Sequence, residues 1–374
     1  MKPIIYADNA ATTKLDKDAL EAMVPWLIDD YGNASQPYSF ARKPKKALAE
    51  AREIIANCIN AQPEEVYFTS GGTESDNWAI KGTGIGSTER NAVVTSAIEH
   101  HAVLNACASL QKEQEIIFID PNNEGIVLPE QLEAHITNKT YLASVMLSNN
   151  EVGTIEPIQE LTEIAHKFGT LFHTDAVQSI GHIPVDVKRL GVDYLSASAH
   201  KFNGPKGVGF LYARKGAPLN SFLDGGKQEY SKRAGTENVA SIVGMAIALQ
   251  NNYKSLAKNE QHLLQLEGLL FSILNGSGLK YKRNGSEKHV PGNISLSFKD
   301  ADGEMLLHRL DLMGIVVSTG AACDSNTTQV SHVLKAMNVP EEYAKGTIRI
   351  SLGKDNTIED IHVIADAIQR ILHG

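Results

Sequence analysis

A chain of 374 residues is too long for one ordinary hydrophobic core and favours a large domain with a smaller one. The formal net charge of −9 argues against direct nucleic-acid binding, and the lack of any apolar run of about 18 residues argues against a membrane span. The three cysteines have no regular spacing and the first residues lack the features of a signal peptide. We therefore expect no disulfide framework, no zinc site and a cytoplasmic protein.

Strand-like and helix-like segments alternate from about residue 65 to residue 215. Strands are predicted at residues 65–68, 92–95, 116–119, 141–147, 171–173, 192–195 and 208–212, with amphipathic helices such as 75–81, 102–111 and 158–168 between them. This alternation predicts an α/β fold in which helices cover both faces of a mostly parallel, seven-stranded sheet. Residues 208–212 follow their neighbour too closely for a helical crossover, so this strand should run antiparallel and make the sheet mixed.

A long helical region, residues 239–274, leads out of this alternating part. After a turn-rich stretch the pattern resumes, with strands at 294–298, 315–317 and 347–351 and helices at 304–313 and 358–372. These short elements predict a compact α+β second domain. We place the large domain at residues 14–255 and the small domain at residues 1–13 and 256–374.

Residues 69–77 follow a predicted strand and open a helix, with two glycines at the junction. Free backbone N–H groups and the helix dipole at such a start favour an anion, and Gly72 lets a phosphate approach closely. The hydroxyls of Ser70 and Thr73 can add hydrogen bonds. An ordinary N-capped helix is the alternative, and a Walker loop is excluded because no lysine follows the glycines.

Polar residues follow three of the predicted strands, at the sheet edge where open α/β folds bind ligands. They are His100, Asn150 and Asp175. Because the side chains of adjacent histidines diverge, a metal shared by His100 and His101 is not expected. The pair is either a surface feature or places one ring against a flat cofactor. An aspartate at this edge could pair with a pyridinium nitrogen and keep it protonated.

Lys201 lies on a tight connection between two predicted strands, after small and hydroxyl residues and before a Gly/Pro-rich turn. A lysine held among apolar neighbours loses hydration, which lowers its pKa and makes the amine a nucleophile toward carbonyls. The alternative, from this stretch alone, is an ordinary loop lysine beside a turn.

Eight segments spread over the chain carry recognisable sequences. They are residues 6–13 (YADNAATT), 69–77 (TSGGTESDN), 99–100 (EH), 149–151 (NNE), 175–178 (DAVQ), 198–201 (SAHK), 233–238 (RAGTEN) and 349–353 (RISLG). In combination they resemble the class-V aminotransferase family of fold-type I enzymes, and within it the cysteine desulfurases of the NifS/IscS type. The resemblance implies pyridoxal 5′-phosphate (PLP) as the cofactor.

The same resemblance implies a role for each matching residue. Lys201 would form the Schiff base with PLP, Asp175 would pair with the ring nitrogen and His100 would stack on the ring. The other expected ligands are Gly72, Thr73, Ser198 and His200 for the phosphate, Gln178 for the phenolate oxygen, Asn150 for the ring and the substrate, and Arg349 for the substrate carboxylate. Thr236 would complete the phosphate site of the partner subunit in a homodimer.

Cys323 lies in a small, polar segment, which predicts an exposed, mobile loop. Cys58 and Cys107 sit in apolar helical patterns and are expected in the core. The loop is similar to the long sulfur-transfer loop of group I desulfurases. It departs from the family pattern at Val330, where proline is frequent, and at Asp324, whose charge would raise the pKa of the thiol.

The resemblance therefore implies a desulfurase, a sulfurtransferase that converts L-cysteine to L-alanine. Lys201 and His100 would move the Cα proton. The Cys323 thiolate would take the sulfur as a persulfide and pass it to an acceptor, such as an iron–sulfur scaffold or a tRNA-thiolating enzyme. No resident metal is expected, although Cys323 could transiently ligate an iron–sulfur cluster.

Two alternatives remain open at this point. A selenocysteine lyase or another class-V enzyme would share every cofactor residue but would not depend on a loop cysteine in the same way. A non-catalytic protein that docks on a sulfur-assembly scaffold would need neither Lys201 nor Cys323.

Overall fold

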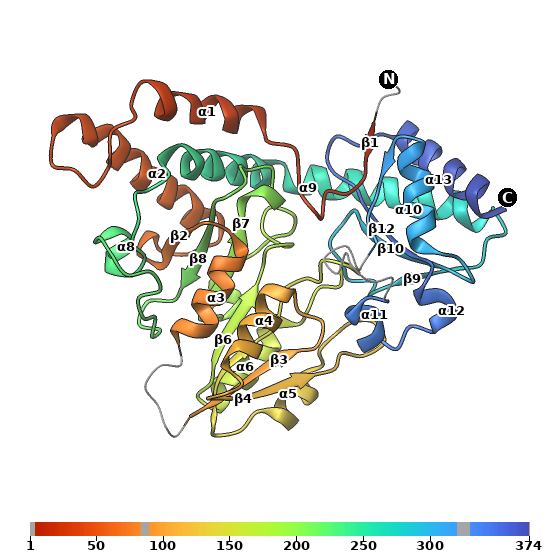
Figure 1. Cartoon of the computed structure of the whole chain (residues 1–374), viewed down its shortest axis with the longest axis horizontal. Coiled ribbons are helices and arrows are strands. Elements are labelled where there is room, and N and C mark those ends of the chain that lie inside the picture. Colours follow the sequence, from red (N-terminus) through yellow and green to blue (C-terminus); the bar gives the residue numbers. More distant parts are fainter. Residues whose placement is uncertain (1–3, 84–89, 320–329, 374) are drawn as a thin grey trace.

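The structure is a computed structural model that describes residues 4–83, 90–319 and 330–373 (Figure 1). Its largest sheet consists of β2 (Val66–Thr69), β3 (Ala92–Ser96), β4 (Glu115–Ile119), β5 (Thr140–Ser144), β6 (Leu171–Asp175), β7 (Tyr194–Ser198) and β8 (Gly209–Ala213). Their spatial order is β2-β8-β7-β6-β5-β3-β4. Strand β8 runs antiparallel to both neighbours, and the other pairs are parallel. The predicted mixed, seven-stranded sheet is confirmed.

One predicted strand is longer than the observed one. The sequence predicted residues 141–147, whereas β5 ends at Ser144. The next residues still follow β6, because Val145 N–H donates to His173 O at 3.2 Å and Leu147 N–H donates to Asp175 O at 2.8 Å. Their apolar side chains are buried, so a continuous apolar run extends past the end of the regular ladder.

Helices cover both faces of the large sheet, as predicted (Figure 1). On one face α3 (Gly72–Gly82) and α4 (His101–Leu110) bury Trp78 and Cys107 against the strands. On the other face lie α2 (Arg42–Cys58), α6 (Ile158–Lys167) and the first half of α9 (Val239–Asn275). The remaining helices of this part are α1 (Lys17–Ile28), α5 (Pro129–His135), α7 (Val187–Leu190) and α8 (Gln228–Ser231).

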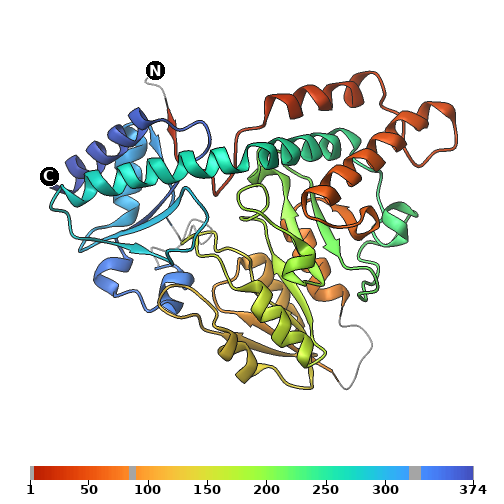
Figure 2. The same cartoon turned by 180° about the vertical axis from the view of Figure 1, so that it is seen from behind.

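A smaller part is built on an antiparallel sheet of order β12-β10-β9. Its elements are β9 (Tyr281–Asn284), β10 (Asn293–Phe298), α10 (Gly303–Leu312), β11 (Ile315–Val316), α11 (His332–Ala336), α12 (Glu341–Ala344), β12 (Thr347–Ser351) and α13 (Ile358–His373). Helix α9 runs from the large sheet into this part as one continuous helix (Figure 2). The start of the chain also belongs here, because β1 (Ile5–Tyr6) pairs in parallel with β11.

Helix α11 joins the two parts next to the strand ends. Val333 and Leu334 of α11 pack with Ile98 and Val152, which follow β3 and β5 in the larger part. Just before the helix, Ser331 Oγ donates to Glu151 Oε2 at 2.5 Å, and both residues are buried. The smaller part is therefore fixed against the turns that carry His100 and Asn150.

The cysteines divide differently from the prediction. Cys107 is fully buried, as expected, but Cys58 at the end of α2 is only partly buried against the core. The pattern of α2 places Cys58 near the edge of its apolar face, and the last turn of a helix is rarely covered completely. Cys323, Asp324 and the loop of residues 321–329 lie outside the described residues. No helix in the described part of the chain is long and apolar enough to cross a bilayer.

Candidate active site

The carboxyl ends of the central strands open into a cleft of about 330 Å³. It is lined, among others, by Asp8, Gly72, Thr73, Asp76, His100, Asn150, Asp175, Gln178, Ser198, His200, Lys201 and Arg349. Nearly all residues that the sequence assigned to cofactor or substrate thus meet in one cavity. The exceptions are Thr236, which lies elsewhere on the chain, and Cys323, whose position the structure does not describe.

Lys201 is held both by its amine and by its backbone. It follows β7 in a short 3₁₀ turn, Ala199–Lys201. Its Nζ donates to Ala10 O at 2.6 Å and to Ala11 O at 2.9 Å, and its own carbonyl accepts a hydrogen bond from His182 Nε2 at 2.8 Å. The position at which the amine meets a ligand in the cleft is therefore fixed by contacts at both ends of the residue.

Two buried carboxyl groups, Asp175 at the end of β6 and Asp76 in α3, line the same cleft. Val177 N–H donates to Asp175 Oδ1 at 2.9 Å, whereas Asp76 Oδ1 lies 3.6 Å from His173 Nε2. Burial raises the pKa of Asp175 to about 6. Burial and the nearby Asp175 charge raise the pKa of Asp76 well above its usual range. A carboxylate on Asp175 would stabilise a protonated ring nitrogen.

His100 is a neutral ring at the start of α4. Ala102 N–H donates to His100 Nδ1 at 3.1 Å, so the proton of the neutral ring sits on Nε2. Burial, with the charge of Lys201, lowers the pKa of His100 to about 4. The rings of His100 and His101 lie 6.3 Å apart at 68°, so they diverge as predicted. Within the described ranges, no group of three or more His, Cys, Asp or Glu side chains is placed to hold a metal ion.

A hollow at the start of α3 adjoins the cleft. It shares Gly72, Thr73, Ser198 and His200 with the cleft and adds Ser70 and Lys206. A side chain at Gly72 would not fit, because its Cβ would lie 2.6 Å from Val177 Cγ2. The backbone N–H groups of an 11-residue helix, flanking hydroxyls and a lysine together suit a phosphate.

Arg349 reaches the cleft from β12 of the smaller part and is 6% exposed. Its Nη1 donates to Asn150 O at 2.8 Å and its Nη2 donates to Asp8 Oδ1 at 2.8 Å. Gln178 Nε2 donates to Ala10 O at 2.9 Å, and its second N–H can donate a hydrogen bond to a ligand oxygen. Both parts of the molecule therefore contribute side chains to one site.

Thr236 is exposed and lies in the segment that precedes α9. This segment is tied to the helix that opens the phosphate-like hollow, because Arg233 Nε donates to Glu74 Oε1 of α3 at 2.7 Å. Thr236 itself does not line the cleft of its own chain, in the part that the structure describes.

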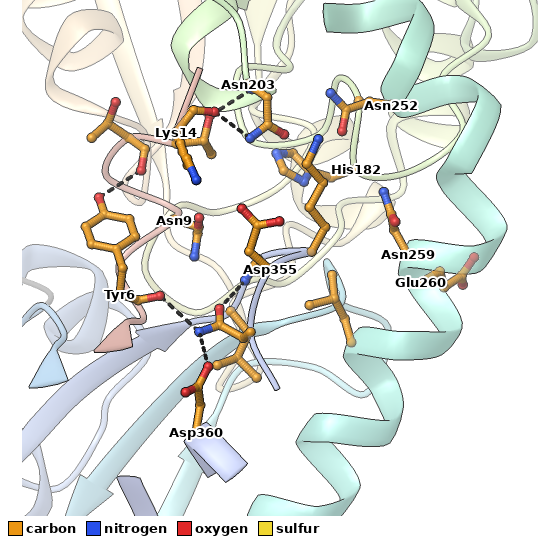
Figure 3. A pocket seen from close by; sticks show the side chains of 18 of the residues that line it. Tyr6, Asn9, Lys14, His182, Asn203, Asn252, Asn259, Glu260, Asp355 and Asp360 are labelled. Atoms are coloured by element: carbon orange, nitrogen blue, oxygen red, sulfur yellow. Dashed lines mark hydrogen bonds between the residues drawn. The ribbon is translucent and has the colours of Figure 1, made fainter. Parts of the chain in front are cut away.

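A larger cavity, of about 480 Å³, is lined by His182 and Asn203 among other residues (Figure 3). It is bounded by the N-terminal segment, by α9 and by the chain between β12 and α13, and its charged side chains Lys14, Glu260 and Asp355 are exposed. His182 lines this cavity and donates to the carbonyl of Lys201, which lines the smaller cleft, so this contact links the two cavities. None of the predicted site residues that the structure describes lines it.

Comparison with known proteins agrees with this geometry. Residues 5–364 match the family model described as aminotransferase class-V. The whole chain is 48% identical to cysteine desulfurase IscS of Dictyoglomus turgidum, of which it covers 95%. It is also 42% identical, over 98% of its length, to cysteine desulfurase IscS of Methanosarcina thermophila, of which it covers 92%. The chain belongs to the cysteine desulfurases of the class-V aminotransferase family.

Solved structures of this family have the same fold. A NifS-like protein superposes with a TM-score of 0.93 at 38% identity, with 99% of each chain covered. A structure titled SspA in complex with cysteine superposes with a TM-score of 0.84 at 33% identity, with 94% of this chain and all of that chain covered.

Members of the family depend on PLP, and the cleft of this desulfurase fits such a group. A buried carboxylate, a fixed amine and a helix N-terminus surround one cavity, and these are the groups that the ring nitrogen, the aldehyde and the phosphate of PLP require. Gly72 lines both the cleft and the hollow, and its lack of a side chain lets the start of α3 pack closely against Val177.

Several residues of the cleft region had no role in the sequence analysis, among them Asp8, Asp76 and Lys206. The first two lie inside the motif segments 6–13 and 69–77, so their presence in a matching segment was the available signal. Which residue of a motif faces the cavity depends on contacts with distant parts of the chain. For Asp8 that contact is with Arg349, far along the sequence.

Proposed function

We propose that the protein is an L-cysteine desulfurase that uses PLP, releases L-alanine and transfers sulfur through Cys323. The observation that carries this proposal is the meeting of Lys201, Asp175, His100 and Arg349 in one cleft, in a chain related to desulfurases over its whole length. We assign the cofactor to a large domain of residues 14–255, and Arg349 and Cys323 to a small domain of residues 1–13 and 256–374.

Each residue of the cleft has a task that follows from its surroundings. The phosphate of PLP would be held by Gly72, Thr73, Ser198, His200 and Lys206. Asp175 would pair with the ring nitrogen, Gln178 would bind the phenolate oxygen, and His100 would stack on the face of the ring. Bound there, PLP supplies an electron sink for the bonds at the substrate Cα. Arg349 binds the substrate carboxylate, with Asn150 beside it, since guanidinium geometry suits a two-point contact.

Proton transfer is the work of Lys201 and His100. The amine of Lys201, held near the carbonyl groups of Ala10 and Ala11, takes the Cα proton of the substrate and later returns one to the product. His100 is neutral and carries its proton on Nε2. It can therefore donate a hydrogen bond from Nε2 without first being protonated.

The sulfur step requires a thiolate, and two of the three cysteines are unsuited to it. Burial raises the pKa of the Cys58 thiol to about 11 and that of the Cys107 thiol to about 12. We therefore assign the nucleophile to Cys323. Its thiolate attacks the substrate sulfur, an S–S bond forms and the Cβ–S bond breaks, and protonation of the remaining carbon fragment gives L-alanine.

Incubation with L-cysteine, PLP and a reductant tests the function, with sulfide and L-alanine measured together. The parent protein should release both in equal amounts, whereas Cys323→Ala should release neither while it retains PLP. Cys58→Ala is the matched control and should keep full turnover. Sulfide release by Cys323→Ala at the parent rate would favour a lyase that needs no protein thiol. A protein without turnover on L-cysteine or L-selenocysteine would be a docking protein.

We further propose a homodimer in which Thr236 reaches the phosphate site of the partner subunit. Two observations support this assignment: Thr236 is exposed, and its segment is bonded to α3, the helix whose start forms the hollow that suits a phosphate. Light scattering during PLP titration should give a dimer at micromolar concentration, and an active, PLP-loaded monomer would contradict the proposal. The sulfur acceptor, an iron–sulfur scaffold or a tRNA-thiolating enzyme, would be found by following ³⁵S from L-cysteine into each purified candidate.

A further inference from the structure

We propose that Asp8 is a positioning residue for the reaction: it turns the guanidinium of Arg349 so that the substrate carboxylate meets one N–H on each Nη atom. This inference rests on the proposed function, because it takes Arg349 as the group that binds the α-carboxylate. It adds a residue for which neither the sequence nor the family comparison supplied a role.

The first support is the hydrogen bonding of Arg349 itself. Nη1 donates to Asn150 O and Nη2 donates to Asp8 Oδ1, each at 2.8 Å. The Nε atom is buried and makes no hydrogen bond within the described part of the chain. A guanidinium carries two N–H groups on each Nη, so one N–H of each remains for a ligand. Two such groups on neighbouring atoms suit the two oxygens of a carboxylate.

The second support is the way in which Asp8 is fixed. Its backbone forms a bridge with Ser351, two residues beyond Arg349 on the same strand. On either side, Asn9 N–H donates to Ser351 O at 3.0 Å and Ser351 N–H donates to Ala7 O at 2.8 Å. Tyr6 Oη donates to the carbonyl of Asp8 at 3.0 Å. The carboxylate therefore has a backbone that cannot shift without breaking the pairing with the end of β12.

The third support is that the side chain of Arg349 extends from the smaller part of the molecule to the larger part. Arg349 belongs to β12, whereas Asn150 lies in the turn after β5 of the larger part. The side chain of Arg349 is 7% exposed and that of Asp8 is 16% exposed, so solvent contributes little to holding the long arginine side chain. Without Asp8 one anchor remains, the carbonyl of Asn150, and a single hydrogen bond leaves the plane of the guanidinium free to rotate.

Charge and geometry at Asp8 can be separated by two substitutions. Asp8→Asn keeps an oxygen acceptor at the same place but removes the negative charge. Asp8→Glu keeps the charge but moves it outward by one methylene group. If Asp8 acts by position, Asp8→Asn behaves like the parent and Asp8→Glu is impaired. If Asp8 acts by charge alone, the order is reversed.

The experiment measures the KM and kcat for L-cysteine and the affinity for L-alanine, read from the absorbance of bound PLP in the holoenzyme. Asp8→Asn should keep both KM and the L-alanine dissociation constant within about threefold. Asp8→Glu should raise both by about tenfold or more with kcat changed less than threefold, since only the carboxylate contact is lost. In the Arg349→Lys background, the same change from Asp8 to Glu should have little further effect.

The outcomes separate this inference from the proposed function. If Arg349→Lys leaves KM and L-alanine affinity unchanged, the assignment of Arg349 fails, and the inference with it. If Arg349→Lys weakens binding but Asp8→Glu does not, or if Asp8→Asn is impaired beyond threefold, only the inference is overturned. Thermal unfolding of each holoenzyme variant, compared with the parent, identifies any loss that comes from misfolding. Both Asp8 variants keep a polar side chain of similar size, so binding can be measured on folded protein.

Discussion

Two cavities are linked by the contact between His182 and Lys201, and they differ in the groups that they bury. The larger one is rimmed by exposed charges such as Lys14 and Asp355. The smaller one contains Asp175 and Asp76, which are almost fully buried, and the neutral His100. Solvent reaches the charges of Lys14 and Asp355, whereas the second cavity holds two carboxyl groups out of water. Burial of such groups, rather than volume, indicates where the chemistry takes place.

The largest expected difference is in turnover, between a variant that lacks the lysine of the smaller cavity and one that lacks a lysine of the larger cavity. Lys201→Ala removes the amine to which we assign transfer of the Cα proton, so turnover of L-cysteine should fall by more than about 10³-fold. The visible absorbance of lysine-linked PLP should be lost as well. Lys14→Ala, in the larger cavity, is the matched control and should keep turnover within about twofold. Equal losses in the two variants would contradict the distinction between the cavities.

A second prediction concerns Glu99, which is fully buried beside the smaller cavity. Its Oε1 accepts hydrogen bonds from Ser96 Oγ at 2.6 Å and from Met146 N–H at 2.8 Å. Burial raises the pKa of Glu99 from its ordinary 4.5 to about 8. Between these values the unfolded chain loses a proton that the folded protein keeps, so the free energy of unfolding decreases as pH rises.

The variant Glu99→Gln keeps the acceptor oxygen and cannot titrate. The stability of the variant relative to the parent should therefore rise between pH 5 and 8, by roughly 1.4 kcal/mol per pH unit at most. Urea unfolding at pH 5, 7 and 9 measures the difference, and the change should level off above about pH 8. Parallel pH dependences for the two proteins would show that Glu99 is ionised in the folded state.

His182 lines the larger cavity and contacts Lys201, which lines the smaller one. Its ring donates to the carbonyl of Lys201, and burial lowers the pKa of His182, so a neutral ring makes this bond. His182→Ala leaves the carbonyl without its donor, which should cost about 1–3 kcal/mol of stability. Because the backbone of Lys201 is then less firmly held, kcat should also fall, by up to about tenfold. A decrease in stability with no change in kcat would show that the contact from the larger cavity does not affect the reaction in the smaller one.

The smallest effect is expected at the rim of the larger cavity. Asp355 is exposed, so Asp355→Ala should change the free energy of unfolding by less than about 0.5 kcal/mol. Turnover and PLP affinity should also stay at the parent values, as measured by sulfide release and by absorbance titration. A marked loss of activity would mean that the larger cavity takes part in the reaction after all.

The parts of the site that could be predicted from the sequence are those encoded locally. The alternating pattern placed His100 and Asp175 at strand ends, and the glycines of residues 69–77 indicated a helix start after another strand. Periodicity also gave the mixed sheet, because residues 208–212 follow β7 too closely for a crossover. It did not give the end of β5, since an apolar run continues past the last ladder residue.

Contacts between distant segments of the chain could not be predicted, because no local sequence pattern contains them. The carbonyls of Ala10 and Ala11 hold the Lys201 amine, and Asp8 holds Arg349, although nothing in the N-terminal segment alone indicates either contact. These contacts exist because the start of the chain is paired with strands from its end. A pattern of neighbours along the sequence cannot show such pairing.

The pairing of β1 with β11 also sets an order in time. Ile5 lies opposite Ile315, so the first strand is made roughly 300 residues before its partner. At about 5–20 residues per second, a ribosome needs on the order of 15–60 s to synthesise that interval. The seven strands of the large sheet are complete well before then and already offer Gln178 and Lys201 to Ala10, but the pairing of β1 with β11 and of Asp8 with β12 has to wait. Asp8 can contact Arg349 only after β12 has left the ribosome, so this part of the cleft is completed late in synthesis.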